Sequence, residues 1–350
     1  MHIDKLLTEA YHRGASDVHI TASSAPVFRL NGLLQPLEGL QKLTPKDTDA
    51  LARQLMTPEQ YNQFISAGDL DFAYQIAGLC RFRVNVYKQS GSVALAVRLI
   101  NLTVPSLEEL GLPQVLGHLS QKARGLVLIT GPTGSGKSTT LASMIDLINN
   151  TQHCHIITLE DPIEFIHNHK KSIINQREVG RDTASFTQGL RAAMREDPDV
   201  ILVGEMRDPE TIATAITAAE TGHLVLGTLH TSSAAQTVDR IIDSFPPHQQ
   251  QQIRVQLANT IQGVVAQQLI PRMDRPGRVA ALEIMVATPA IRNLIREGKT
   301  YQILSQIQTG AKHGMQTLDL SLKDLYSKGI ISRDEMLKHS VDSQLLERML

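Results

Sequence analysis

A glycine-rich stretch in the middle of the chain, GPTGSGKSTT at positions 131–140, restricts the possible folds more than any other part of the sequence. It directly follows the apolar run GLVLIT and runs into STTLASMIDLINN, which reads as a helix. Glycine loses more conformational freedom on folding than other residues, so closely spaced glycines indicate a backbone that other residues adopt poorly. The stretch therefore predicts a buried strand, a tight loop and a helix in succession.

The same stretch matches the pattern G-x-x-x-x-G-K-[ST] in the context that this motif requires. Closely spaced glycines let successive backbone N–H groups point inward around phosphate oxygens, and the start of the following helix adds the positive end of its dipole. Lys137 would reach the β- and γ-phosphates, and the hydroxyl of Ser138 would complete a magnesium shell. A glycine-rich turn without a ligand is the alternative. The predicted phosphate-binding residues are Pro132, Thr133, Gly134, Ser135, Gly136, Lys137, Ser138 and Thr139.

From about residue 124 onward, the sequence repeats an apolar strand, a loop and a helix. The strands are GLVLIT, HIITLE, VILVG and HLVLGTLH, with SFTQGLRAAMRE and PETIATAITAAE among the helices. Strands this apolar, alternating with helices, predict an α/β fold whose parallel sheet is covered on both faces. After about residue 245 the sequence reads as mainly helical, with one further strand candidate, RVAALEIMV.

Residues 1 to about 100 alternate short helices and short strands, which indicates a compact α+β unit. The segment LTVPSLEELGLP then breaks the pattern with two prolines and a glycine. We therefore expect a first domain over residues 1–103, a linker over 104–122 and a second domain over 123–350. The helical C-terminal region of the second domain should begin at about residue 288.

Composition narrows the possible functions. The chain has 350 residues, of which 42% are hydrophobic and 20% charged, as expected for a globular protein of about two domains. A net charge of -1 and an aromatic content of 4% give little basis for a protein that coats nucleic acid. Two cysteines without CxxC spacing favour a reducing compartment. No apolar run reaches the roughly 18 residues that would span a bilayer.

Carboxylates follow two of the predicted strands. They are candidates for phosphate chemistry, because hydrolysis needs an oriented water and neutralisation of the developing charge. In DPDVILVGE, Glu205 lies just beyond the strand and could hold magnesium through water. In TLEDPIEF, Glu160, Asp161 and Glu164 follow another strand, where Pro162 favours a turn that could aim a carboxylate at the γ-phosphate. For Glu160 and Asp161, a solvated turn or a capping role is equally open.

Two histidines flank the strand in TGHLVLGTLH. His230 follows its carboxyl end, where a parallel sheet places residues that contact ligands. His223 precedes the strand, and a buried histidine with a structural role is the alternative there.

In CRFRVNVYK, apolar residues alternate with Arg81, Arg83 and Asn85, so one face of the strand carries guanidinium groups, and Arg98 lies on the following strand. These arginines could compensate phosphate charge from a neighbouring subunit or after domain closure, or could simply form a solvated sheet face.

Together, GPTGSGKSTT, TLEDPIEF, AAMREDPDVILVGEMRD and TGHLVLGTLHTSSAAQTVDRIIDSFP resemble the type II/type IV secretion ATPase family, the hexameric motors of secretion systems and pili. ASDVHI and the arginine-bearing strands extend the likeness over nearly the whole chain. The resemblance implies an α/β fold: a RecA-like P-loop domain with a mostly parallel sheet, preceded by a smaller PAS-like α+β domain and followed by C-terminal helices. It also implies a catalytic base (Glu164), a Walker B carboxylate (Glu205), His-box residues (His223 and His230) and trans-acting arginines (Arg81, Arg83 and Arg98).

AIRNLIREGKTYQI, at 290–303, is similar to a signature of the pilus-retraction members of that family. Extension and type II secretion motors commonly carry an additional amino-terminal domain and a tetracysteine zinc insert, for which this chain has neither the length nor the cysteines. As a helix, the segment puts Ile291, Leu294 and Ile295 on one face. Arg292, Arg296 and Glu297 fall largely on other faces and could engage a neighbouring subunit or a membrane-anchored platform.

The resemblance therefore implies a homo-hexameric motor that hydrolyses ATP with Mg²⁺ and drives type IV pilus retraction through domain closure. It further implies a cytoplasmic location at the inner face of the membrane, an inner-membrane pilus platform protein as partner, and no direct contact with nucleic acid. A pilus-assembly, type II secretion or competence-pilus motor is the first alternative. A RecA-like nucleic-acid translocase and a non-hydrolysing, nucleotide-gated scaffold are the others.

Overall fold

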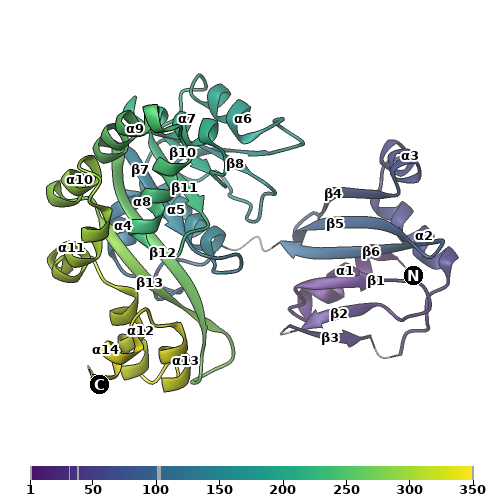
Figure 1. Cartoon of the computed structure of the whole chain (residues 1–350). Helices are drawn as coiled ribbons and strands as arrows, with labels where there is room; N and C mark the ends of the chain where they lie inside the picture. Colours follow the sequence, from purple (N-terminus) through teal and green to yellow (C-terminus); the bar gives the residue numbers. More distant parts are fainter. Residues whose placement is uncertain (1, 31, 38, 101–103, 349–350) are drawn as a thin grey trace. The chain divides into compact units, whose positions relative to one another are not determined.

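The computed structural model describes residues 2–30, 32–37, 39–100 and 104–348. The chain divides into two compact units, Met1–Thr103 (unit 1) and Val104–Leu350 (unit 2) (Figure 1). The predicted end of the first domain falls on residues 101–103, which lie outside the described residues. Each unit has its own buried apolar core.

Unit 1 is an α+β unit with a six-stranded antiparallel sheet in the order β3-β2-β1-β6-β5-β4. Its helices are α1 (Ile3–His12), α2 (Pro45–Leu55) and α3 (Pro58–Ala67), and its strands are β1 (Asp17–Ile20), β2 (Val27–Leu30), β3 (Leu33–Pro36), β4 (Asp69–Ile76), β5 (Cys80–Gln89) and β6 (Ser92–Ile100). Phe82, Val84 and Val86 of β5 are completely buried in the same cluster as the apolar side of α1. The alternation predicted from the sequence of β5 is thus confirmed.

Unit 2 is built on a seven-stranded sheet in the order β13-β12-β7-β11-β10-β8-β9. Its strands are β7 (Gly125–Thr130), β8 (His155–Glu160), β9 (Ile173–Glu178), β10 (Val200–Val203), β11 (Leu224–Leu229), β12 (Ile261–Pro271) and β13 (Arg278–Val286). All neighbouring pairs are parallel except β12 and β13, which are antiparallel. The predicted α/β fold with a mostly parallel sheet is confirmed.

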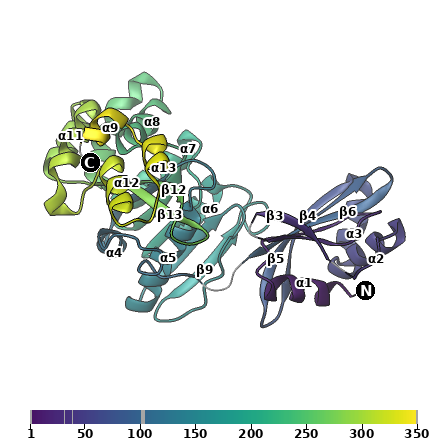
Figure 2. The ribbon, with the colours of Figure 1, turned by 90° about the horizontal axis from the view of Figure 1, so that it is seen from below.

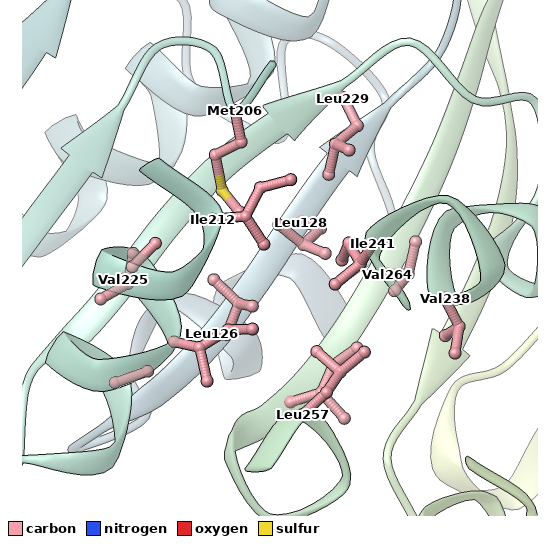
Figure 3. Close-up of a cluster of buried hydrophobic side chains, with 14 of the residues drawn as sticks. Leu126, Leu128, Met206, Ile212, Val225, Leu229, Val238, Ile241, Leu257 and Val264 are labelled. Carbon is pink, nitrogen blue, oxygen red and sulfur yellow. The ribbon is translucent and has the colours of Figure 1, made fainter. Parts of the chain in front are cut away.

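Helices cover both faces of this sheet, as the apolar strands predicted (Figures 1 and 2). One face packs against α6 (Phe186–Ala193), α7 (Pro209–Glu220), α8 (Ala234–Asp243), α9 (Pro247–Thr260) and α10 (Pro289–Arg296), and the other against α4 (Val115–Ser120) and α5 (Lys137–Thr151). Successive residues of β7 alternate between the two clusters. Leu126 and Leu128 face α7 and α9 (Figure 3). Val127 and Ile129 face α5.

The segment 104–122, expected as a linker between domains, lies within unit 2. It contains α4, and Leu112, Val115, Leu116 and Leu119 of this segment pack into the same cluster as α5. The prolines and the glycine do interrupt the sequence pattern, but the leucines between them supply an apolar face. Burial of that face against the sheet makes the segment part of the second unit.

The region after residue 245 contains more strand than the sequence indicated. β13 was predicted, but the 11-residue strand β12 beside it was not. Helix α9 ends at Thr260 and β12 begins at Ile261, without a proline or glycine between them to mark the change. β9, a short edge strand rich in polar residues, was missed as well. β12 bonds to the glycine-rich loop, and β9 bonds to the loop between β8 and β9.

The C-terminal region is helical, as predicted. α11 (Ile303–Thr309), α12 (Leu318–Ser327), α13 (Arg333–His339) and α14 (Ser343–Arg348) follow α10. Apolar residues of α12 and α13 form a separate cluster with Ile270 of β12 and Ala281 of β13. Within the described part of the chain, no helix is long and apolar enough to cross a membrane.

Candidate active site

The glycine-rich loop connects β7 to α5, as the sequence predicted. Gly134 and Gly136 have φ angles of 79° and 87°, in the left-handed region that glycine tolerates best. Gly131 meets a different constraint, because a Cβ atom there would lie 2.2 Å from the carbonyl oxygen of Gln267 in β12. The three glycines therefore serve both the tight turn and its close approach to a neighbouring strand.

The loop borders a pocket of about 470 Å³ at the carboxyl ends of the parallel strands. Nine of the predicted site residues line it: Thr133, Gly134, Gly136, Lys137, Ser138, Thr139, Glu164, Glu205 and His230. Pro132 lines an adjoining pocket, and Ser135 is buried within the loop. Parallel strands place their following loops at one edge of a sheet, which explains how segments far apart in sequence meet here.

The structure does not bring His223 to this pocket. His223 precedes β11, at the amino end of the strand, whereas His230 follows its carboxyl end. Its ring Nδ1 lies 2.9 Å from the carbonyl oxygen of Ala218, near the C-terminus of α7. Within unit 2 this half-buried histidine therefore lies at the amino edge of the sheet, against the end of α7, and does not line the pocket.

Lys137 begins α5 and donates from Nζ to the carbonyl oxygens of Gly131 and Pro132, at 2.8 and 3.0 Å. Burial lowers the pKa of this lysine, and the charges of Glu205 and Glu164 oppose that effect. Both carboxylates thus act electrostatically on the same ammonium group. All three charged groups line the same pocket.

Glu205 follows β10 and is held by two cationic or polar partners. Its Oε1 lies 2.7 Å from Nε2 of His230 and also accepts from Nε of Arg207. The Glu205 side chain is only 20% exposed. β10 and β11 are neighbouring strands. The histidine that follows β11 therefore fixes the carboxylate that follows β10.

Glu164 lies on the loop between β8 and β9, and its neighbours in that loop are tied to β9. Gln176 of β9 accepts from the N–H of His167 at 2.9 Å and donates to the carbonyl oxygen of Phe165 at 2.8 Å. Glu178, also of β9, accepts from the N–H of Ile163. These bonds bracket Glu164 on both sides and leave its own side chain exposed at the pocket.

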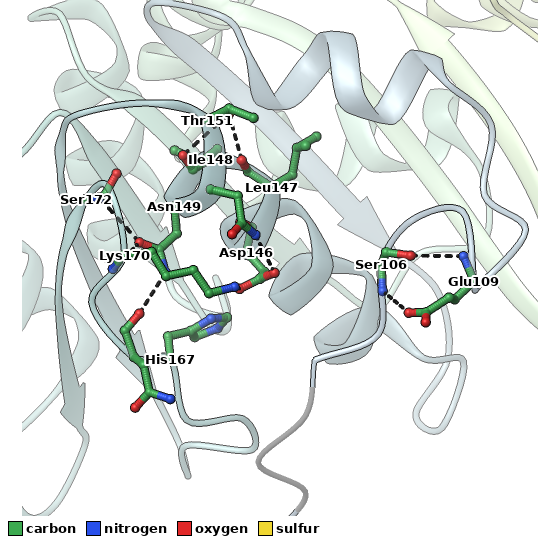
Figure 4. A network of polar contacts seen from close by, with 12 residues as sticks. Ser106, Glu109, Asp146, Leu147, Ile148, Asn149, Thr151, His167, Lys170 and Ser172 are labelled. Carbon is green, nitrogen blue, oxygen red and sulfur yellow. Dashed lines mark hydrogen bonds and ion pairs between the residues drawn. The ribbon is translucent and has the colours of Figure 1, made fainter.

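The same loop is anchored to α5 by a polar network (Figure 4). Asn149 is completely buried, and its Oδ1 accepts from the N–H groups of Lys170 and Ser172. Its Nδ2 donates to the carbonyl oxygen of Asn168 at 2.8 Å. An ion pair of 2.6 Å joins Lys170 to Asp146 of α5. The helix that starts at the glycine-rich loop thus also holds the loop that contains Glu164.

Glu160 does not occupy a solvated turn. Its Oε1 accepts from Thr158 at 2.6 Å and from Gln176 at 3.2 Å, and burial raises its pKa. Asp161, by contrast, is exposed. Both residues line the pocket: Glu160 as a half-buried hydrogen-bond acceptor and Asp161 as an exposed carboxylate.

The predicted arginines lie together on the polar face of the sheet of unit 1. Arg83 and Arg98 are opposite each other on β5 and β6, and Arg81 is on the same face of β5. Nε of Arg98 donates to Oδ1 of Asp17 at 3.0 Å, and Nε of Arg83 lies 3.8 Å from Asp71. The side chains of Arg83 and Arg98 are 43% and 70% exposed, so both guanidinium groups remain accessible.

Sequence reasoning missed several residues that line the pocket or bond to its glycine-rich loop. Arg278 of β13 donates to the carbonyl oxygen of Gly134 at 3.4 Å, and Gln267 of β12 bonds the glycine-rich loop. No motif marks either position, since each reaches the loop across the sheet. Arg207 could have been predicted from the sequence, because it lies only two residues after Glu205. It places a cation beside a carboxylate at the end of a strand.

A glycine-rich loop at the carboxyl edge of a parallel sheet, with a lysine and carboxylates from adjacent strands around one pocket, defines a P-loop nucleoside triphosphatase. A family model described as type II/IV secretion system protein matches residues 1–275. The chain belongs to this family, as its motifs predicted.

Relatives with curated descriptions support the assignment over nearly the full length. The chain is 52% identical over 334 residues to the type IV pilus retraction ATPase PilT of Pseudomonas aeruginosa, covering 95% of this chain and 96% of that protein. It is 47% identical over 323 residues to a twitching motility protein of Neisseria gonorrhoeae, covering 92% and 86%. The crystal structure of the pilus retraction motor PilT with bound ADP matches with a TM-score of 0.94 at 49% identity, covering 100% of both chains.

Proposed function

We propose that this chain is an ATP-hydrolysing motor that drives type IV pilus retraction and twitching motility. The observation that carries the proposal is the pocket that Lys137, Glu164 and Glu205 line together with the glycine-rich loop. The descriptions of the two relatives, a pilus retraction ATPase and a twitching motility protein, support the biological role. The ADP bound to the similar solved structure supports an adenine nucleotide as the ligand.

ATP would bind with its phosphates against the loop. The backbone N–H groups between Gly134 and Thr139 and the amino end of α5 offer donors and a positive dipole to phosphate oxygens. In the structure, Lys137 donates to two carbonyl oxygens of the loop. A bound triphosphate would offer charged oxygens in their place, and these make stronger hydrogen bonds with an ammonium group.

Magnesium is the expected cofactor, and the residues present suit it. Ser138 and Glu205 both line the pocket and present oxygen atoms, which are the ligands that Mg²⁺ prefers. Bound there with the nucleotide, the ion would neutralise phosphate charge. His230 keeps the Glu205 carboxylate in place through its 2.7 Å contact.

Glu164 is proposed as the general base that orients and deprotonates the attacking water. It is exposed at the pocket, while the loop on either side of it is bonded to β9. A carboxylate on a fixed backbone is suited to this role, because the water must be placed in line with the bond that breaks.

The motor would work as a homo-hexamer, with residues 1–103 and the following unit as its moving parts. Arg81, Arg83 and Arg98 would approach the γ-phosphate of a neighbouring subunit, so that the charge of the nucleotide controls domain closure. A cytoplasmic position against an inner-membrane pilus platform protein, with no direct role for nucleic acid, completes the proposal. The polar face of unit 1 supports it by presenting accessible guanidinium groups.

Phosphate release by the purified chain tests the enzymatic part. We expect hydrolysis of ATP that requires Mg²⁺ and is not stimulated by DNA. Failure to bind or hydrolyse ATP would reject the proposal, and stimulation by DNA would favour a translocase.

The direction in which the motor works is tested in a deletion strain. Loss of a retraction motor should leave cells with excess pili that do not twitch, whereas cells without pili would indicate an assembly motor.

A further inference from the structure

Gln267 of β12 is a buried polar residue directly beneath the glycine-rich loop. It is 3% exposed, and its strand neighbour Ala266 is paired with Thr130, the last residue of β7. Its Nε2 donates to the carbonyl oxygen of Ser135 at 2.7 Å, and its Oε1 accepts from the hydroxyl of Thr140 at 2.8 Å. The amide of one side chain thus joins the middle of the loop to the first turn of α5.

The bond to Ser135 fixes the orientation of a peptide group. The peptide between Ser135 and Gly136 is trans, so its C=O and N–H point in opposite directions. Because the carbonyl oxygen is directed at the Gln267 amide, the N–H of Gly136 points away from that amide, and Gly136 itself lines the pocket. A rotation of this peptide by half a turn would put a carbonyl oxygen there instead, where it would repel a phosphate.

The glycines of the loop match this arrangement. A Cβ atom on Gly136 would lie 2.9 Å from Nε2 of Gln267, and one on Gly131 would lie 2.2 Å from its main-chain oxygen. Both glycines also have positive φ angles, 87° and 143°. The loop therefore packs on Gln267 so closely that a side chain at either position would displace it.

We propose that Gln267 is a positioning residue for nucleotide binding, which holds the Ser135–Gly136 peptide with its N–H directed at the bound phosphates. This inference rests on the proposed function, since it assumes that ATP and ADP are the ligands of the pocket. Thr140 in turn holds the Gln267 amide in the orientation that donates to Ser135. Such preorganisation stabilises the bound state, because the peptide group need not reorient when the nucleotide enters.

The direct test is Gln267→Glu, which keeps the size of the side chain but removes its donor. A carboxylate repels the Ser135 carbonyl oxygen and still accepts from Thr140. Loss of one correctly aimed hydrogen bond to a charged phosphate should raise the Kd for ADP by about 10- to 100-fold. KM for ATP should rise in parallel, while kcat at saturating ATP should change much less, because Glu164 and Glu205 are untouched.

Gln268→Glu is the matched control. This next residue of β12 points to the opposite side of the strand, where its Oε1 lies 3.0 Å from Nδ1 of His339 on α13. The same charge is introduced one position away from the loop. ADP affinity and KM should stay at wild-type values in this variant.

Thermal unfolding separates positioning from a general loss of stability. The melting temperature is measured without nucleotide and with ADP, and the proposal predicts a smaller ADP-induced rise for Gln267→Glu. A variant with a lower melting temperature but an unchanged Kd for ADP would overturn the proposal. If Gln267→Glu does not fold, Thr140→Val tests the proposal in its place, because it removes only the hydrogen bond that orients Gln267. Unchanged ADP affinity in Thr140→Val would also reject the proposal. Wild-type protein that binds no ADP would instead refute the proposed function itself.

Discussion

The ammonium group of Lys137 is subject to opposing influences that show how single residues shape this site. Burial lowers its pKa, and the carboxylates of Glu205 and Glu164 favour its charged form. The lysine must stay charged to bind phosphate, yet be sufficiently buried for its charge to act in a low-dielectric setting. The two carboxylates thus have a second effect beside their proposed chemical roles, since each favours the charged form of the lysine that we propose binds the phosphates.

Glu164→Gln should separate binding from chemistry. The amide keeps the size of the side chain but cannot accept the proton of the attacking water, so we expect turnover to fall by about 100-fold or more. The Kd for ADP should stay within about twofold of wild type, because the loop is unchanged. Steady-state phosphate release and ADP titration measure the two effects. Retained turnover would show that another group is the base.

His167 gives a prediction for pH-dependent stability. Burial lowers the pKa of this histidine from 6.5 to about 4, with smaller effects of Asp146 and Lys170. Between these values the unfolded chain binds a proton that the folded chain does not, so stability is complete above about pH 6.5 and is lost as the pH falls towards 4. The contribution is up to about 3 kcal/mol.

Replacing His167 by Gln should therefore reduce the loss of stability on acidification. We expect the melting temperature of His167→Gln to fall less than that of wild type between about pH 7.5 and pH 4.5. His12→Gln, at an exposed histidine of α1, serves as the control. Parallel pH profiles for all three proteins would contradict the assignment of this effect to His167.

Among the secondary-structure elements, the junction of α9 and β12 depends on an arginine of α10. Arg292 was expected on an exposed face, but its Nη1 donates to the carbonyl oxygens of Ala258 and Asn259 at 2.6 and 2.9 Å. These are among the last carbonyl groups of α9, which have no partner within the helix. Ile291 and Ile295 pack into the core as predicted. The arginine thus stabilises the point where a helix changes into the strand that carries Gln267.

Arg292→Ala should destabilise unit 2. Two carbonyl groups at a part-buried helix end lose their donor, which costs about 1–3 kcal/mol. Arg292→Lys should restore part of this loss, because one ammonium group can still reach a carbonyl oxygen. Arg296→Ala removes one exposed contact with Asn259 and should cost less than about 0.5 kcal/mol. Urea denaturation measures all three; equal effects of the two alanine variants would contradict the capping role.

For the whole molecule, the proposed motor depends on groups in both units. The residues that line the pocket belong to unit 2, whereas the accessible arginines lie on the sheet of unit 1. Each unit has its own core, so a change in one sheet face need not disturb the other unit. This division allows the role of the arginines to be tested separately from nucleotide binding.

Arg83→Ala should slow ATP turnover in the assembled ring by about 10-fold or more, with little effect in isolated subunits. The reason is that its guanidinium would neutralise transition-state charge only across a subunit boundary. Arg13→Ala, which removes an exposed ion pair with Glu9 in the same unit, is the control and should leave turnover unchanged. Phosphate release measured above and below the assembly concentration provides the comparison. Equal loss in rings and subunits would indicate a structural role for Arg83.

Much of the site could be predicted because its motifs are local. Lys137, Glu205 and His230 each follow an apolar strand within a short segment, and parallel pairing brings such segments to one edge. β12 was not predicted, because α9 continues directly into it. Gln267 lies on β12 and was therefore not predicted either. The resemblance implied a site role for both His223 and His230, although the two residues flank one strand whose ends lie on opposite edges of the sheet.

The amino-acid pattern alone was sufficient to predict the strand, the glycine-rich loop and the helix, and also the α/β character of unit 2. Both follow from backbone preferences and from burial over a few consecutive residues. The contacts that orient those motifs were set by the packing of distant strands. Gln267 reaches Ser135 over 132 positions of sequence, and Gln176 reaches Phe165 from the next strand. No spacing of residues in the sequence predicts a hydrogen bond of this kind, because the bond depends on which strands become neighbours and in what register.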